Sequence, residues 1–191
     1  KMYVVSVMPC VAKKFEKTRP EMKNDELENV DAVITTRELA RMIKQANIDF
    51  VGLEDSNFDD PMGEATGAAA IFGTTGGVME AALRTAYETV TGKELGKVEF
   101  EDVRGADGIK KAEVDLDGTK VKVAVAHGLS NARIILDEIK AGTADYQFVE
   151  IMACPGGCVM GGGQPIVSSK IRNDVDVRAK RAECLYNIDE K

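Results

Sequence analysis

The chain of 191 residues is 44% hydrophobic and carries a formal net charge of −7. This acidic balance argues against a nucleic-acid partner, because binding a phosphate backbone requires a concentrated basic surface. No run of 18 apolar residues occurs, so we expect no membrane-spanning helix and a cytoplasmic protein. The length suits one globular α/β domain over residues 1–191, and an apolar run at residues 3–7 predicts that the chain begins within that domain.

Hydrophobic periodicity predicts strands and helices that alternate along the chain. In chain order these are strands at residues 3–8 and 31–35, a helix at 37–45, a helix that follows Gly77 and ends near Gly92, strands at 98–103, 109–116 and 121–126, a helix at 131–141, a strand at 146–152, and a terminal helix within 170–191.

Five residues mark where some of these elements begin or end. Thr36 and Ser130 are the predicted N-caps of the helices at 37–45 and 131–141, because a hydroxyl oxygen can accept from the first turn. Gly142 is expected to end the latter helix. The dipeptide Asp117-Gly118 predicts a type I′ turn, and therefore a β-hairpin.

Together these elements predict an α/β fold with a largely parallel sheet, flanking helices and one β-hairpin. Cys10 follows the first predicted strand and Cys154 follows the last. Ligands of open α/β sheets gather at the carboxyl ends of strands, so two cysteine segments that are far apart in the sequence are expected to converge on one site.

The strongest chemical signal is a glycine-rich segment with two cysteines four residues apart, Cys154-Pro155-Gly156-Gly157-Cys158, followed by a further run of glycines. A backbone without Cβ atoms can turn sharply and approach a bulky inorganic centre with its N–H groups. The alternative is a tight turn with two inert, buried cysteines. We favour metal or redox chemistry, because two thiols in so glycine-rich a loop are unusual for packing alone.

Cys10 supplies a third thiol, and Lys13 and Glu16 follow it at helical spacing. On its own this segment is weak evidence, since a lone cysteine after a strand is more often a core residue, and Lys13 with Glu16 could be an ordinary solvated pair. A Cys3His zinc site using His127 is a further alternative. The spacing fits no compact zinc ribbon, whereas iron–sulfur clusters commonly use dispersed cysteines. Cys184 is predicted to pack within the terminal helix.

The two cysteine segments resemble the second and third H-cluster motifs of iron-only (FeFe) hydrogenases. The resemblance also covers residues 34–40, 63–69, 71–82 and 125–133. It implies a catalytic H-cluster domain from the C-terminal region of the family's large chain, in which a 4Fe-4S cubane shares a cysteine sulfur with a two-iron unit. The implied reaction is the reversible reduction of protons to H2.

The resemblance also implies roles for individual residues. Three cysteines match metal ligands, with Cys158 at the bridging position between cubane and two-iron unit, and Lys13 matches a residue that hydrogen-bonds a cyanide of the distal iron. Three apolar residues match positions that line the cluster pocket. The implied metal ligands are Cys10, Cys154 and Cys158, and the implied pocket residues are Met8, Phe72 and Met152.

The family's first cysteine motif, which holds the fourth cubane ligand and a proton-donating cysteine, has no counterpart here. We therefore expect one lobe of a two-lobed active-site domain, truncated at both ends, that is inactive and holds no stable cluster by itself. Its implied partners are the missing N-terminal part of the same domain and a ferredoxin or NAD(P)-linked electron-transfer subunit. The alternative is a non-catalytic iron–sulfur protein that resembles the hydrogenase-like factors of cytosolic cluster assembly.

Overall fold

A computed structural model describes residues 2–57, 59, 67–93, 103–105 and 107–189. The chain divides into two compact units, which we call unit 1 and unit 2. Unit 1 comprises Lys1–Glu64 and Gly161–Ile171, and unit 2 comprises Ala65–Met160 and Arg172–Lys191. Both units contain helices and strands, which confirms the predicted mixed α/β class. Among the described residues, no helix is long and apolar enough to cross a membrane.

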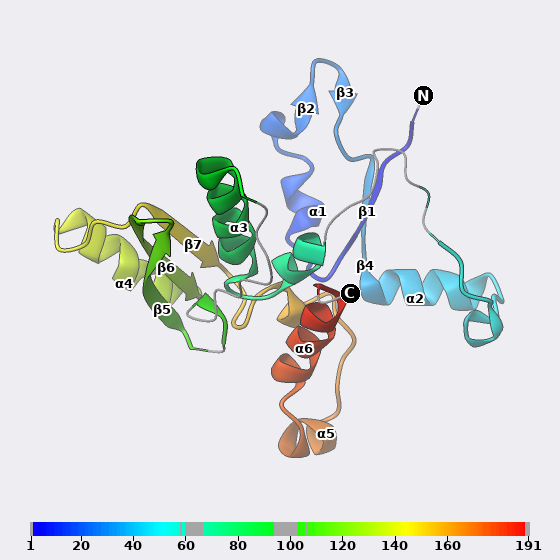
Figure 1. The fold of residues 1–191 in the computed structure, drawn as a ribbon. Coiled ribbons are helices and arrows are strands. Elements are labelled where there is room, and N and C mark those ends of the chain that lie inside the picture. The colour runs from blue at the N-terminus through cyan, green and yellow to red at the C-terminus, as the bar shows by residue number, and fades with distance from the viewer. Residues whose placement is uncertain (1, 58, 60–66, 94–102, 106, 190–191) are drawn as a thin grey trace. The chain divides into compact units, whose positions relative to one another are not determined.

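Unit 1 is built on a short parallel pair of strands (Figure 1). Met8 lies opposite Thr35 at the ends of the two strands, so the segments that follow both strands leave from the same edge. The elements are β1 (Val5–Met8), α1 (Lys13–Glu16), the hairpin strands β2 (Lys23–Asn24) and β3 (Leu27–Glu28), β4 (Ala32–Thr35) and α2 (Thr36–Gln45), with 3-10 turns at Pro20–Met22 and Phe50–Gly52.

The N-terminus of α2 differs from the prediction by one residue. The N-cap is Thr35, whose hydroxyl accepts from the Glu38 amide at 3.2 Å, while the Glu38 carboxylate accepts from the Thr35 amide at 2.7 Å. Thr36 is already helical, so the prediction of Thr36 as the cap was wrong. The reciprocal arrangement requires a glutamate three residues after the cap, and Glu38 stands at that distance from Thr35.

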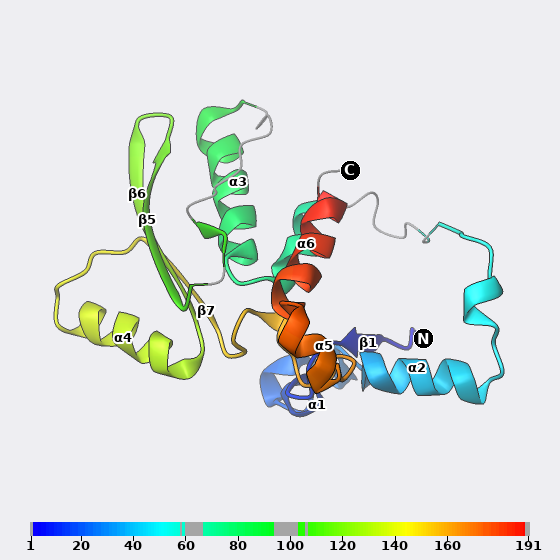
Figure 2. The same ribbon diagram turned by 90° about the horizontal axis from the view of Figure 1, so that it is seen from below.

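Unit 2 contains a three-stranded sheet of order β5-β6-β7, in which β6 is antiparallel to β5 and parallel to β7. The views in Figures 1 and 2 show helices α3 and α4 beside these strands. The elements are a 3-10 segment at Gly67–Gly73, α3 (Gly77–Thr91), β5 (Ile109–Leu116), β6 (Thr119–His127), α4 (Leu129–Lys140), β7 (Phe148–Met152), a 3-10 turn at Cys158–Met160 and α6 (Val177–Asp189); α5 (Ser169–Asp174) spans residues of both units.

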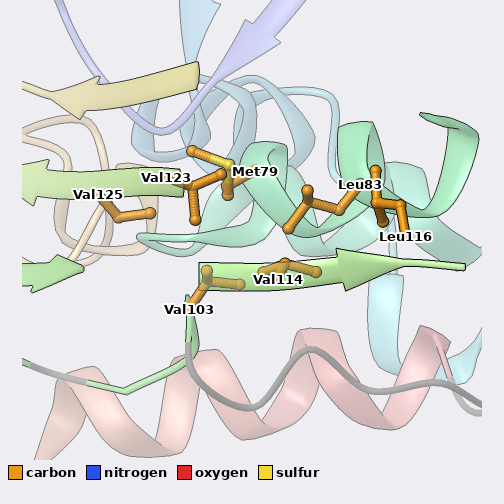
Figure 3. Packing of buried hydrophobic residues seen from close by; sticks show 7 residues of the cluster. All are labelled: Met79, Leu83, Val103, Val114, Leu116, Val123 and Val125. Atoms are coloured by element: carbon orange, nitrogen blue, oxygen red, sulfur yellow. The ribbon is translucent and has the colours of Figure 1, made fainter. Parts of the chain in front are cut away.

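The central strand β6 is covered on both faces because its alternate residues pack against different helices. Val123 and Val125 join a cluster with Met79 and Leu83 of α3, shown in Figure 3. Ala124 and Ala126 point the other way and pack with Ile135 of α4. A period of two along the strand thus places α3 and α4 on opposite faces of the sheet.

The hairpin prediction is confirmed, since β5 and β6 pair antiparallel and both turn residues have positive φ, 55° at Asp117 and 93° at Gly118. The predicted cap Ser130 was wrong: α4 begins at Leu129 after Gly128, and no side chain caps it. The terminal region contains two helices, α5 and α6, rather than one. Residues 98–102 of a predicted strand lie outside the described residues.

Candidate functional site

In unit 1, Cys10 lies two residues after the end of β1 and precedes α1. Met8 is the last residue of the strand and Lys13 the first residue of the helix, so the turn carries three predicted site residues within six positions. Cys10 is a half-buried thiol. The glycine run of unit 1 lies against this turn, because the Gly163 amide donates to the Pro9 carbonyl at 2.8 Å.

Met8 and Lys13 line one pocket of about 230 Å³ within unit 1, together with Ser6, Glu16, Lys17, Met22, Val30 and Val33. The Lys13 ammonium donates to both Glu16 carboxylate oxygens at 2.7 and 2.8 Å. The solvated pair considered as an alternative is therefore present in the structure. It does not exclude a second role, since an ammonium has three donors.

In unit 2, Cys154 and Cys158 flank a tight turn that follows β7. The Gly157 amide donates to the Cys154 carbonyl at 3.0 Å, and Gly156 has a φ of 86°. Proline at the second position and a glycine with positive φ at the third are typical of a type II turn. The sequence Cys-Pro-Gly-Gly-Cys therefore forms a defined turn, with one thiol before it and one after.

This turn is held against the segment that precedes α3. The Thr75 amide donates to the Gly156 carbonyl at 3.2 Å. A Cβ on Gly157 would lie 2.7 Å from the Thr75 nitrogen and 2.9 Å from the Gly73 oxygen, so only glycine permits this approach. The buried Thr75 hydroxyl has no hydrogen-bond partner among the described residues.

Helix α6 covers the other side of the cysteine turn. Arg181 donates to the Val159 carbonyl at 2.8 Å, next to Cys158. The side chain of Arg178 lies where a Cβ on Gly156 would be. Cys184 lies on the same helix but is exposed, so the prediction that it packs was wrong.

Two predicted apolar site residues, Phe72 and Met152, lie in unit 2. Phe72 lies in the 3-10 segment Gly67–Gly73 with 48% of its surface exposed. Met152 ends β7 and pairs in register with the buried His127 at the end of β6. Within the described part of the chain, no group of three or more His, Cys, Asp or Glu side chains is arranged to hold a metal ion.

Two buried charges near the cysteine turn, Glu150 on β7 and Lys110 on β5, were not predicted as site residues from the sequence. Burial lowers the pKa of Lys110 to about 8, although the negative charges of Glu150 and Asp107 oppose this shift. Glu150 is the one charged residue of β7, a signal that could have identified it, because such groups are rarely buried without partners. Lys110 had no such signal, since β5 carries three other charged residues.

The residues present fit part of a thiolate-bound iron–sulfur centre. Cys10, Cys154 and Cys158 are half-buried thiols that follow strand ends or flank a glycine turn, and soft thiolate ligands suit iron–sulfur clusters. The buried Thr75 hydroxyl beside the turn adds a donor of the kind that such a centre can use. Three thiols are one fewer than the usual four.

An α/β protein with this arrangement belongs to the class suited to a cysteine-bound metal centre. Residues 1–162 match the family described as iron only hydrogenase large subunit, C-terminal domain. The chain therefore belongs to the iron-only hydrogenase family, which confirms the resemblance seen in the sequence.

Relatives agree with this assignment. The chain is 56% identical over 189 residues, 99% of its length, to the NADP-reducing hydrogenase subunit HndD of Solidesulfovibrio fructosivorans, and covers 32% of that protein. It is 58% identical over 166 residues, 87% of its length, to the periplasmic Fe hydrogenase large subunit of Nitratidesulfovibrio vulgaris, and covers 39% of it. The chain thus spans about a third of these relatives.

A solved FeFe-hydrogenase structure that reveals stepwise H-cluster assembly, that of HydA(deltaEFG), matches all of this chain and 54% of its own, with a TM-score of 0.74 and 42% identity. A more distant match is the protein NAR1 of Arabidopsis thaliana, 36% identical over 177 residues, which are 85% of this chain and 37% of that protein.

Proposed function

We propose that this chain forms part of the active site of a hydrogenase that interconverts two protons and two electrons with H2. The observation that carries the proposal is the pair of thiols, Cys154 and Cys158, that a type II turn holds directly after β7. The H-cluster, when bound in the complete protein, supplies the iron atoms at which protons and electrons combine.

In this proposal Cys10, Cys154 and Cys158 bind the cubane, and Cys158 also bridges to the two-iron unit. Thiolate ligands must be deprotonated to bind iron, so metal binding releases protons. The glycine run that follows Cys158 along the chain is hydrogen-bonded beside Cys10 through Gly163 and Pro9. The proposal that the three thiols bind one centre rests on the match of the chain to the hydrogenase family.

Lys13 has a separate role, which is to donate a hydrogen bond to a cyanide ligand of the distal iron. An ammonium offsets negative charge most effectively where water is scarce. The pocket that Lys13 and Met8 line supports this role, with Glu16 orienting the ammonium. Phe72, Met8 and Met152 then provide apolar surface that keeps water from the metal centre.

The fourth cubane ligand and the proton path come, in this proposal, from an N-terminal part of the same domain. Electrons reach the cubane from ferredoxin or from an NAD(P)-linked subunit, and the NADP-reducing relative supports the latter. We propose a cytoplasmic protein, and expect no activity and no stable cluster from the 191 residues alone.

The test is iron and sulfide analysis of the complete hydrogenase that contains this chain, prepared anaerobically as serine variants of each cysteine. C10S, C154S and C158S are each expected to lose most cluster iron and all H2 evolution, because each removes a ligand. C184S is the matched control and is expected to keep both, since Cys184 is exposed on α6. Full iron content in C158S would refute the ligand assignment.

Lys13 is tested separately by infrared spectroscopy. K13A is expected to retain the cubane but to bind the two-iron unit weakly, with altered cyanide bands. The control is K14A, which removes an exposed ammonium that pairs with Glu38. Unchanged cyanide and carbonyl bands together with full activity in K13A would contradict the assigned role.

A non-catalytic iron–sulfur protein of the cluster-assembly type is a second candidate, supported by the similarity to NAR1. The identity of 36% is well below the 56% found for the hydrogenase subunit. Iron bound to the complete protein without any H2 evolution, after the two-iron unit has been supplied, would favour this candidate over the first.

A further inference from the structure

The buried carboxylate of Glu150 caps helix α3, which begins 73 residues earlier in the chain. It accepts from the Gly76 amide at 2.6 Å and from the Met79 amide at 2.7 Å, and only 6% of the residue is exposed. The first amides of a helix lack partners within the helix, and a carboxylate there is stabilised by charge-assisted hydrogen bonds. Gly76 has no side chain that could cap α3, so Glu150 on β7 provides this cap.

Lys110 holds the same segment from strand β5. Its ammonium donates to the carbonyls of Thr75 and Gly105, each at 3.1 Å, and 8% of the residue is exposed. Two buried side chains of opposite charge therefore bind consecutive residues, with Lys110 on the Thr75 carbonyl and Glu150 on the Gly76 amide. This fixes the backbone at the start of α3 from two different strands.

The residues held in this way are the ones that contact the cysteine turn. The Thr75 amide donates to the Gly156 carbonyl, and Thr74 and Thr75 lie within 3 Å of where a Cβ on Gly157 would be. Glu150, which lies on β7, also precedes Cys154 by only four residues in the chain. These contacts connect three parts of unit 2. Glu150 links β7 to the start of α3, the start of α3 is hydrogen-bonded to the cysteine turn, and the turn follows β7 along the chain.

We propose that Glu150 and Lys110 are positioning residues that hold the start of α3 as a rigid platform for the Cys154 and Cys158 thiols. Both residues act through the backbone of Thr75 and Gly76. This proposal rests on the proposed function, because the start of α3 serves as a support for the two thiols only if these thiols bind iron.

A purely structural role would have a different signature. If Glu150 only stabilised unit 2, its removal would loosen that unit as a whole. A positioning role predicts a local change at the turn, because opening of a region depends on the hydrogen bonds of that region. Cys10 in unit 1 and Cys184 on α6 report on the rest of the chain, so the four cysteines form a built-in set of probes.

The experiment measures the alkylation rate of each of these four cysteines by iodoacetamide and mass spectrometry, in the complete protein freed of metal and in its E150Q variant. The glutamine side chain has nearly the same shape as that of glutamate but lacks its charge and one of its two acceptor oxygens. Loss of one charge-assisted hydrogen bond is expected to raise the rates of Cys154 and Cys158 roughly tenfold. Cys10 and Cys184 should keep their rates. E113Q is the matched control, since Glu113 makes an exposed pair with Lys120.

K110M is the second variant, and it is expected to produce the same selective increase at Cys154 and Cys158. Unchanged rates in both variants, or an equal rise at all four cysteines, would overturn the positioning role. If neither variant folds, the amide protons of the wild-type protein provide the test. The amide protons of Gly76 and Met79 should be shifted far downfield and exchange slowly, and ordinary shifts with fast exchange would overturn the proposal.

Alkylation of the metal-free protein does not depend on iron. If the complete protein binds no iron, the proposed function fails while the selective increase in alkylation can still be observed. If iron binds normally but E150Q shows no selective increase, the positioning role alone fails. As a spectroscopic readout in the complete protein, E150Q is expected to shift the midpoint potential of the cubane, whereas E113Q should not.

Discussion

Glu80 provides the sharpest test of how unit 2 is stabilised. This residue of α3 is 0% exposed, and its carboxylate accepts from Arg84 at 2.6 Å and twice from Arg104 at 2.8 Å. Arg84 also forms two bonds to Asp189 near the end of α6, at 2.7 and 2.9 Å. One buried carboxylate thus links α3 to two guanidiniums, and through Arg84 to the C-terminal helix.

The variant E80Q keeps the side-chain volume and removes the charge, which leaves both guanidiniums opposite a neutral amide. Removing one partner of a buried ion pair costs about 3–5 kcal/mol. We expect the lower end of this range, about 3 kcal/mol, because both arginines are partly exposed to solvent. Each arginine also retains another partner in E80Q. Arg84 keeps its ion pair with Asp189, and Arg104 keeps its cation–π contact, 4.5 Å from the centre of the Tyr186 ring. The loss should appear in the free energy of unfolding.

Urea unfolding followed by far-ultraviolet circular dichroism measures this loss. The control is E113Q, which makes the same change at an exposed ion pair with Lys120 and should cost less than about 0.5 kcal/mol. A loss below about 1 kcal/mol in E80Q would refute the argument, because it would mean that the arginines find equivalent partners without the carboxylate.

Three further changes test other parts of the fold by the same unfolding assay. T35A removes the hydroxyl that caps α2 and should cost about 1 kcal/mol, with T18A, which removes an exposed hydroxyl, as the control. G118A should cost about 1 kcal/mol from its φ of 93° alone, since no atom lies within 4 Å of the added methyl, whereas G162A, equally open but without positive φ, should be neutral. For Lys110, the folded pKa of about 8 lies below the unfolded value, so the unfolded state binds more protons between these values. Lys110 therefore adds stability as pH rises from about 8 to about 10.5, and the excess stability of wild type over K110M should grow over that range; a constant difference would contradict the lowered pKa.

Features set by neighbouring residues could be predicted from the sequence. The Asp117-Gly118 hairpin and the end of helix α3 just before Gly92 follow from short patterns, and the structure confirms both. The cysteine segments also follow strand ends as expected. These features depend on backbone preferences and apolar spacing, which act within a few residues.

Errors arose where two neighbouring residues could play the same part. Thr35 and Thr36 are both good caps, and only the reciprocal bond to Glu38 selects Thr35. Ser130 is a suitable cap by type, but α4 starts before it, after Gly128. The choice in each case depends on where the preceding strand ends, which is set by pairing with other strands.

The buried charges could not have been placed from sequence, because their partners are distant in the chain. Glu150 and its amide partners are separated by 71 and 74 residues, and Lys110 reaches a carbonyl 35 residues away. Local patterns such as Pro155 and Gly156 determine the shape of the cysteine turn, whereas these long-range contacts determine where the turn lies. A substitution of Pro155 or Gly156 should therefore distort the turn itself. A substitution of Glu150 or Lys110 should leave the shape of the turn intact but release it from α3. The thiol reactivities of E150Q therefore distinguish the two effects.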